Sequence, residues 1–136
     1  MRDRNSYDII VKPIDFFLPS EEADPEAVQF LATAIASAGI WTAPVPVEGQ
    51  TGIVMDGNHR IRAARLLGLR HLPCVLLSYR DPRVSVMNWW TAEPFPVERI
   101  IRSILFNRKM LPYKSTRHHF APALPATAFQ LATLRA

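Results

Sequence analysis

The chain has little of several features that would place it in a class at once. Only one of its 136 residues is cysteine, so no disulfide can form within the chain, and the thiol fits a reducing compartment. No apolar run approaches the ~20 residues that cross a bilayer. Residues 1–6 lack the apolar core of a secretory signal. These absences predict a cytoplasmic protein in which Cys74, set in an apolar run, is a buried and inert thiol.

What the chain does contain is typical of one globular domain over residues 1–136. Hydrophobic residues make up 49% of the sequence and charged residues 21%. The net charge of +4 comes largely from arginines and suits ligands that carry phosphate, which include both nucleotides and nucleic acids. Twelve prolines predict many short connections.

The order of apolar patterns predicts an α/β fold. Short apolar or alternating runs predict strands over residues 7–13, 44–47, 53–55, 71–79 and 83–87. Helical periodicity predicts helices over residues 26–38, 59–67 and 97–107. Asp24 and Pro25 are suited to begin the first helix, and Gly39 to end it. We expect residues 109–120 to form a basic loop, and the tail to add one short strand or helix.

The turn from Asp56 to Arg60 is the most informative segment of the sequence. A short buried strand ends at Asp56 and Gly57, and a helix follows at once. The free N–H groups and dipole of such a helix start form an anion site, and Gly57 permits close approach of a ligand. Arg60 and Arg62 add positive charge, and Asp56 could hold Mg²⁺ beside phosphates. The local residues fit equally well a plain Asp-Gly turn whose first helical residues are solvated.

Three segments in order resemble the ParB/sulfiredoxin superfamily. They are Gly39–Val47, Ile53–Ala64 and Leu67–Val75. In that superfamily a Gly-x-x-Arg turn at a helix start binds nucleotide phosphates. The resemblance implies an α+β domain with a small mixed sheet and helices packed on it.

Further motifs are similar to those of the free-serine kinases, a free-amino-acid kinase branch of that superfamily. The Asp-Gly-x-His-Arg sequence of the turn resembles the corresponding turn of these kinases. Leu18–Glu22 is similar to their His-Glu motif, with Ser20 in place of histidine, and Leu111–His118 is similar to their Pro-x-Lys-x-Thr-Arg-His element. This branch implies phosphoryl transfer from ATP or ADP, with Mg²⁺, to the hydroxyl of a free amino acid, with L-serine as the default acceptor.

The kinase resemblance assigns roles to the turn and to the segment before it. Glu21 matches the glutamate that takes the proton from the acceptor hydroxyl, with Glu22 as its competitor. Asp56 is expected at the reaction centre and as the metal ligand. Phosphate binding is expected at Gly57, Asn58, His59 and Arg60, whereas Arg62 is expected at the surface.

The same resemblance places the acceptor in the C-terminal part of the chain. Thr116, Arg117 and His118 match the acceptor-binding element, in which an arginine fork pairs with a carboxylate. Trp89 is expected to line the acceptor pocket in preference to Trp90, and the other tryptophan to lie in the core. We therefore expect residues 8–80 to bind the nucleotide and residues 81–136 to bind the acceptor.

Departures and alternatives qualify this reading. Asn58 stands where the kinases have a second histidine. A phosphate site that uses backbone N–H groups is compatible with this replacement, whereas one that uses the histidine side chain is not. Asn58 also stands where sulfiredoxins need their catalytic cysteine, so that chemistry is not expected. The alternatives are a ParB-like, nucleotide-dependent DNA-binding or regulatory protein, which would need a helix-turn-helix after Tyr79, and a non-catalytic nucleotide-binding module. We expect no nucleic-acid partner and no membrane, and a homodimer would bury either the tail or the surface of Trp89 and Trp90.

Overall fold

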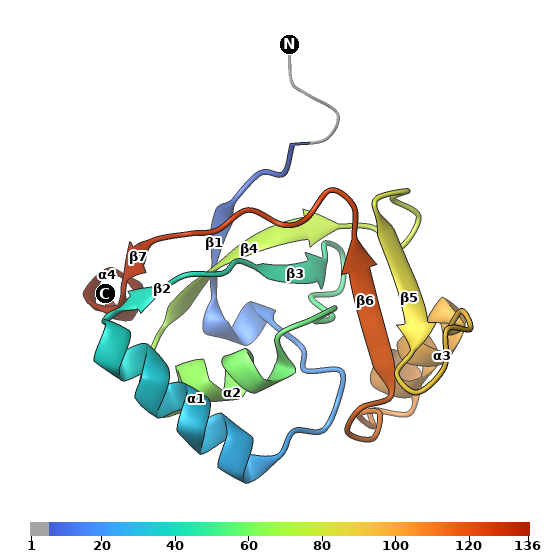
Figure 1. Cartoon of the computed structure of the whole chain (residues 1–136), viewed down its shortest axis with the longest axis horizontal. Coiled ribbons are helices and arrows are strands. Elements are labelled where there is room, and N and C mark those ends of the chain that lie inside the picture. The colour runs from blue at the N-terminus through green and yellow to red at the C-terminus, as the bar shows by residue number, and fades with distance from the viewer. Residues whose placement is uncertain (1–5) are drawn as a thin grey trace.

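A mixed three-stranded sheet with the strand order β1-β4-β3 forms the centre of the molecule (Figure 1). The computed structural model describes residues 6–136, so the segment judged to lack a secretory signal falls almost wholly outside it. Strand β1 (Ile10–Pro13) is antiparallel to β4 (His71–Leu77), and β3 (Val45–Glu48) is parallel to β4. The parallel pair requires a crossover, which α2 (Asn58–Leu66) supplies.

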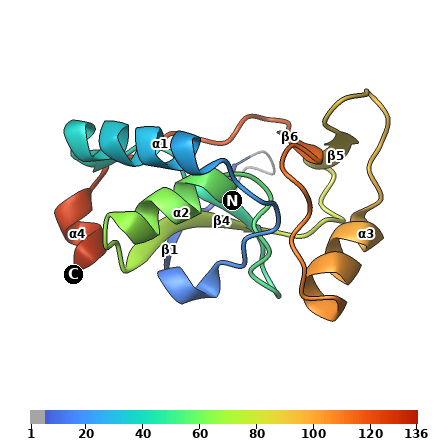
Figure 2. The same cartoon turned by 90° about the horizontal axis from the view of Figure 1, so that it is seen from below.

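Helix α1 (Pro25–Ala38) lies beside α2 and in contact with it, as Figure 2 shows. Its ends are those predicted from the sequence. The Asp24 side chain accepts a hydrogen bond from the Glu26 N–H (3.2 Å), Pro25 is the first helical residue, and Gly39 ends the helix with φ of 74°. A 3₁₀ turn, η1 (Ile14–Phe16), follows β1.

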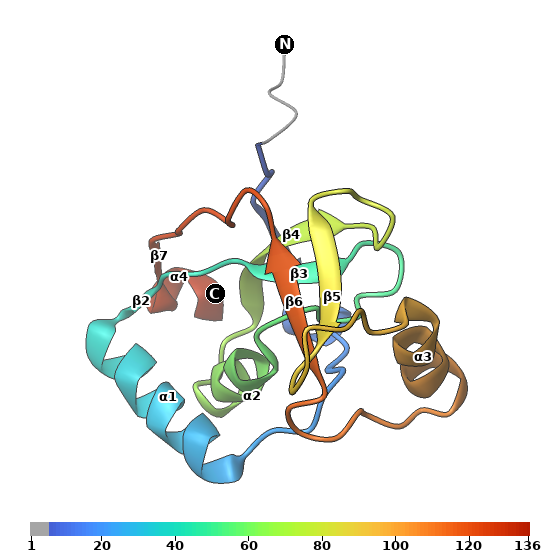
Figure 3. The same ribbon diagram turned by 45° about the vertical axis from the view of Figure 1, so that its right-hand side comes forward.

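A second pair of strands lies away from α1, beside the central sheet in Figure 1 and in front of it in Figure 3. It consists of β5 (Val84–Asn88) and β6 (Thr116–Phe120), which are antiparallel. Helix α3 (Val97–Ile101) continues as the π-helical segment η2 (Arg102–Phe106) and flanks this pair. Strands β2 (Ile40–Trp41) and β7 (Phe129–Gln130) pair near the C-terminal helix α4 (Leu131–Arg135).

Three predictions of local structure were wrong. Residues 116–120 belong to β6 and not to a loop, because their pairing with β5 comes from a distant part of the chain and leaves no apolar pattern. Residues 53–55 make only isolated bridges, from Ile53 to Leu18 and from Val54 to Val47, since the run is too short for a continuous ladder. The tail was expected to form one short strand or one short helix, and it forms one of each.

The main core joins the sheet to α2 and to the C-terminal segment. Its fully buried side chains include Trp41, Ile61, Leu72 and Leu134. Cys74 is also fully buried, in a strand paired on both sides, and burial raises the pKa of its thiol to about 11. The prediction of a buried thiol is thus confirmed. Within residues 6–136 there is no helix of sufficient length and apolar character to span a membrane.

Gly52 lies against residues 16–18, which lead to Glu21, and this close contact fixes their position. Gly52 has φ of 78°, and a Cβ atom built on it would lie 2.1 Å from the carbonyl oxygen of Phe16. The Leu18 N–H donates to the Gly52 carbonyl (2.8 Å), and the Val54 N–H donates to the Leu18 carbonyl (2.9 Å). The residues that lead to Glu21 are therefore held against residues 52–54. These precede the turn from Asp56 to Arg60, which we call the phosphate turn.

Candidate active site

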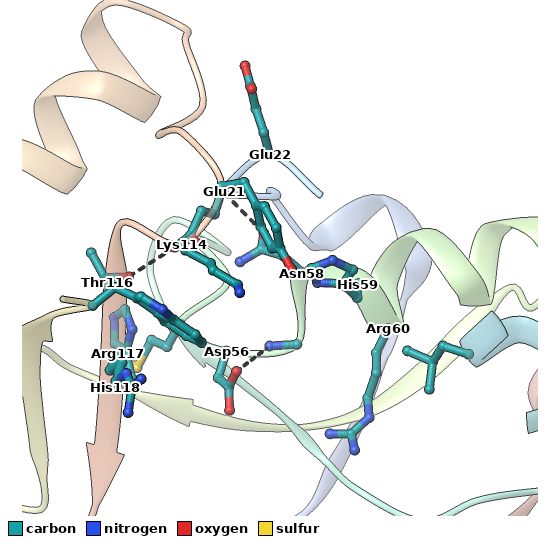
Figure 4. A pocket seen from close by; sticks show the side chains of 15 residues that line it. Glu21, Glu22, Asp56, Asn58, His59, Arg60, Lys114, Thr116, Arg117 and His118 are labelled. Carbon is teal, nitrogen blue, oxygen red and sulfur yellow. Dashed lines mark hydrogen bonds between the residues drawn. The ribbon is translucent and has the colours of Figure 1, made fainter. Parts of the chain in front are cut away.

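All the site residues predicted from the sequence line one cavity of about 630 Å³ (Figure 4). They come from the segment before α1, from the start of α2, from the end of β5 and from the start of β6. The residues are Glu21, Asp56, Gly57, Asn58, His59, Arg60, Trp89, Thr116, Arg117 and His118. Arg62 is not among the residues that line the cavity; its guanidinium reaches the Asn58 carbonyl (3.0 Å).

The start of α2 presents open backbone donors to this cavity. Gly57 is the N-cap with φ of 95°, and no side chain caps the helix. The first amides of a helix have no partner within it, so those of Asn58, His59 and Arg60 remain available to an anion. Asp56 is exposed, and one of its oxygens accepts a hydrogen bond from the Gly57 N–H (2.8 Å).

The Asn58 side chain is turned toward the Glu21 segment. Its Oδ1 accepts hydrogen bonds from the N–H groups of Ser20 (2.8 Å) and Glu21 (3.2 Å), and its Nδ2 donates to Ser20 Oγ (3.2 Å). Ser20 Oγ in turn donates to the Val54 carbonyl (2.6 Å). Both lone pairs of the amide oxygen are thus used, one of the two Nδ2 hydrogens is donated to Ser20, and the ring of contacts holds the side chain on the Glu21 segment. The backbone N–H of Asn58 stays open at the helix start. Ser20 and Asn58, which both depart from the kinase pattern, contact one another.

The His59 ring joins the start of α2 to the start of α1. Its Nε2 accepts a hydrogen bond from the Asp24 N–H (3.2 Å), and the ring packs edge-on against Tyr113 at 5.5 Å between centroids. A nitrogen that accepts an N–H carries no proton, so the remaining donor of the neutral ring is Nδ1–H. His59 therefore has a structural contact, and it has one N–H left to offer to a ligand.

The Glu21 carboxylate is held at both oxygens. Oε1 accepts from the Ser115 N–H (3.1 Å), and Oε2 accepts from the Thr116 hydroxyl (3.1 Å), which itself is buried. Each oxygen keeps a second lone pair for a ligand hydroxyl. Glu22 is exposed, and Figure 4 shows its side chain pointing away from the other labelled residues. The geometry thus holds Glu21 in place and leaves Glu22 in solvent, and it commits the Thr116 proton to Glu21.

Arg117 and Trp89 form one wall of the cavity. The guanidinium carbon of Arg117 lies 4.3 Å from the centroid of the Trp89 ring, a cation–π contact that keeps the guanidinium in place. Trp90 does not line the cavity and is 75% exposed. The expectation that the second tryptophan lies in the core was wrong, because the chain turns outward immediately after β5.

The His118 ring is an uncharged member of the cavity wall. Its Nε2 lies 2.9 Å from the Tyr79 hydroxyl, and burial lowers the pKa of His118 to about 4. Burial has the opposite effect on the Tyr79 hydroxyl and raises its pKa, so neither group is charged at pH 7. His118 can therefore contribute a hydrogen bond to a ligand carboxylate, while the charge comes from Arg117. His119, on the opposite side of β6, is exposed.

The residues of the cavity could hold Mg²⁺ together with the phosphates of a bound ligand, and they do not form a metal site by themselves. Among residues 6–136 no three His, Cys, Asp or Glu side chains gather to hold a metal. Mg²⁺ is commonly bound by one or two carboxylates together with substrate phosphates and water. Asp56, exposed beside the open amides of α2, matches that donor set.

A second hollow of about 320 Å³ adjoins the first at the phosphate turn. Asp56, Gly57 and Arg60 line both. The other walls are residues 42–46, ahead of and within β3, and residues 124–126 near the C-terminus. No sequence motif marks these walls, because the two segments are far apart in the chain and meet only when it folds.

Comparison with known proteins identifies the family. The model of the ParB N-terminal domain matches residues 4–89. The chain belongs to the ParB N-terminal domain family. This match covers the phosphate turn and ends before β6, so the Thr116–His118 segment of this ParB-family chain lies outside it.

Among curated proteins, this ParB-family chain is similar to two archaeal serine kinases. It is 30% identical over 95 residues to the ATP-dependent L-serine kinase of Staphylothermus marinus, over 67% of this chain and 38% of that protein. It is 26% identical over 97 residues to the ADP-dependent L-serine kinase of Thermococcus kodakarensis, over 63% and 40%. The matches thus span about two fifths of the length of these relatives.

A solved structure of a free serine kinase in complex with AMP superimposes on this ParB-family chain with a TM-score of 0.80 at 13% identity, over 94% of each chain. The likeness confirms the α/β fold that the motifs predicted.

Proposed function

We propose that this ParB-family chain is a cytoplasmic kinase that transfers the terminal phosphoryl group of ATP or ADP to the hydroxyl of a free amino acid. L-Serine is the proposed acceptor and O-phosphoserine the product. One observation carries the proposal: a held carboxylate, a phosphate-binding helix start and an arginine line the same cavity. The names of the curated relatives, one ATP-dependent and one ADP-dependent, support both donors.

The proposed reaction uses the two sides of the cavity separately. Nucleotide phosphates bind the first amides of α2, with the nucleoside in the adjoining hollow, and residues 8–80 form this half. Residues 81–136 form the other half, where Arg117 and His118 bind the acceptor carboxylate and Trp89 bounds its pocket. Mg²⁺ held by Asp56 would neutralise charge on the phosphates. No nucleic-acid partner is part of this proposal.

Glu21 acts as the base in this scheme. The acceptor oxygen forms a bond to the terminal phosphorus while the bond from that phosphorus to the bridging oxygen of the nucleotide breaks. The acceptor proton passes to the Glu21 carboxylate, and the nucleotide leaves with one phosphate fewer. Such transfer depends on positioning and charge neutralisation, which a small site can provide.

The test of the proposal is a product assay. The protein is incubated with ATP or ADP, Mg²⁺, and L-serine or L-threonine, and the mixture is examined by ³¹P NMR. We expect a phosphomonoester signal that needs both nucleotide and amino acid. Failure to form product with any pair, together with nucleotide-dependent retardation of DNA in a gel, would instead indicate a ParB-like DNA-binding protein.

Arg117 provides a prediction on the acceptor side. Replacement of Arg117 by Met removes the two-point contact to a carboxylate, so we expect the KM for the amino acid to rise by roughly 10- to 100-fold. The Kd for the nucleotide should stay unchanged because the donor half is intact. His119→Ala, two residues along the same strand and outside the cavity lining, is the matched control. An unchanged KM in Arg117→Met would place the carboxylate elsewhere.

A further inference from the structure

The cavity contains a lysine to which the scheme above gives no task. Lys114 lines the cavity and precedes β6 by two residues. Its ammonium nitrogen lies 5.3 Å from the ring centroid of Tyr113, 5.6 Å from that of Trp89 and 5.9 Å from that of Trp90. Figure 4 shows the side chain reaching into the cavity, toward the side where Asp56 and Asn58 lie.

The charge of Lys114 is not neutralised within the described part of the chain. None of the ion pairs or hydrogen bonds of residues 6–136 involves its ammonium group, whose contacts are with aromatic rings. A ring face attracts a cation and orients it, and its quadrupole carries no net charge to cancel it. Lys114 is half-buried as a residue, and its ammonium group is oriented by the rings and still available to an anion.

The backbone of Lys114 indicates that its position is imposed. Lys114 has φ of 59°, in the left-handed region that residues other than glycine seldom adopt. Such strain persists where the surroundings fix it, and it is concentrated at functional sites. The next residue, Ser115, donates its N–H to the Glu21 carboxylate, so the backbone that carries Lys114 is attached directly to the proposed base.

The three cations of the cavity wall are separated by position. Arg60 lies at the phosphate turn and also lines the second hollow, on the donor side. Arg117 is stacked on Trp89, on the acceptor side. Lys114 comes from the segment that holds Glu21; its ammonium lies near the same Trp89 ring as Arg117, and its side chain extends toward the turn.

We infer that Lys114 binds the phosphoryl group in transit, and this inference rests on the proposed kinase function. Its N–H groups donate to the non-bridging oxygens of the terminal phosphate while the acceptor oxygen bonds to phosphorus and the bond to the nucleotide breaks. Lys114 keeps its proton throughout, and the acceptor proton goes to Glu21. A fixed cation at the site of developing charge stabilises the transition state more than the ground state.

Lys114→Met tests the inference, because methionine keeps the unbranched side chain up to its last atom and removes the charge. We expect kcat to fall by about 100-fold or more, while the KM for the amino acid changes by less than about threefold. The affinity for AMP should be unchanged, and the preference for ADP or ATP over AMP should shrink. Lys109→Met is the matched control, since Lys109 is exposed and does not line the cavity.

A chemical rescue separates loss of charge from loss of folding. Alkylation of Lys114→Cys with 2-bromoethylamine rebuilds an ammonium of nearly the same length, and kcat of the same preparation should rise by at least about tenfold. The native Cys74 is fully buried and should not react. If alkylation of Cys at position 114 is complete and kcat does not rise, the inference is overturned.

Failure of the inference and failure of the proposed function give different results. If the parent protein forms phosphoserine and Lys114→Met retains its kcat, the inference alone fails. If the parent forms no phosphorylated amino acid, the kinase proposal fails. The affinities for ADP and AMP then decide about Lys114: a preference for ADP that disappears in Lys114→Met supports the phosphate contact, and a preference that is unchanged overturns it.

Discussion

The Glu21→Gln variant is expected to lose turnover by about 100- to 10,000-fold, the range that a positioned general base contributes. Glutamine has the shape of glutamate and cannot accept the acceptor proton at neutral pH. Its Oε1 can still accept from the Ser115 N–H, and the Thr116 hydroxyl can rotate to accept from the amide. The fold and the nucleotide Kd should therefore be retained. Steady-state kinetics and calorimetric titration with ADP measure the two quantities.

Glu22→Gln is the matched control for this variant. Glu22 adjoins Glu21 and also lines the cavity, but it is exposed and its side chain points away from the other labelled residues. It should keep a kcat close to that of the parent protein. A large loss in Glu22→Gln with normal turnover in Glu21→Gln would reverse the assignment of the base. Equal losses in both would indicate that the charge of the segment matters more than proton transfer.

Gly52→Ala is expected to destabilise the protein by about 3 kcal/mol or more. The added Cβ would lie 2.1 Å from the Phe16 carbonyl oxygen, and backbone cannot rotate away as a side chain can. The left-handed φ of 78° adds its own cost for a residue with a side chain. Urea unfolding measures the loss of free energy. Because Leu18 is hydrogen-bonded to Gly52, the folded fraction should also have a displaced Glu21 and lower turnover.

Gly68→Ala separates the two contributions. Gly68 has φ of 70°, and a Cβ built on it has no neighbour within 4 Å. It should therefore carry only the cost of the left-handed backbone, about 1–2 kcal/mol. If Gly52→Ala were no more destabilising than Gly68→Ala, the contact with Phe16 would not be what requires glycine at position 52.

Local patterns were sufficient to predict what depends on neighbours in the sequence. The cap by Asp24, the end of α1 at Gly39 and the open helix start at Gly57 follow from residue types over a few positions. The motifs also named residues that turned out to line one cavity. They could do so because proteins that share the same motifs in the same order share a fold, and the fold brings those motifs together. The individual contacts could not be read from the motifs.

Contacts between distant segments could not be predicted from those patterns. Thr116 donates to Glu21 from 95 residues away, and β6 forms only by pairing with β5. The free ammonium of Lys114 was present in a motif, but its role depends on what surrounds it in three dimensions. The second hollow depends on residues 42–46 meeting residues 124–126, which have no pattern in common.

The Asn58 amide has a consequence for how this site can change over generations. One residue starts the helix that we propose binds phosphate and also fixes the backbone that carries Glu21. Under the proposed function, a substitution of Asn58 that alters phosphate affinity should also displace Glu21, so donor preference and turnover should change together at this position. Variation in donor choice between lineages should therefore accumulate at residues such as those of the second hollow. Position 58 should change only together with Ser20.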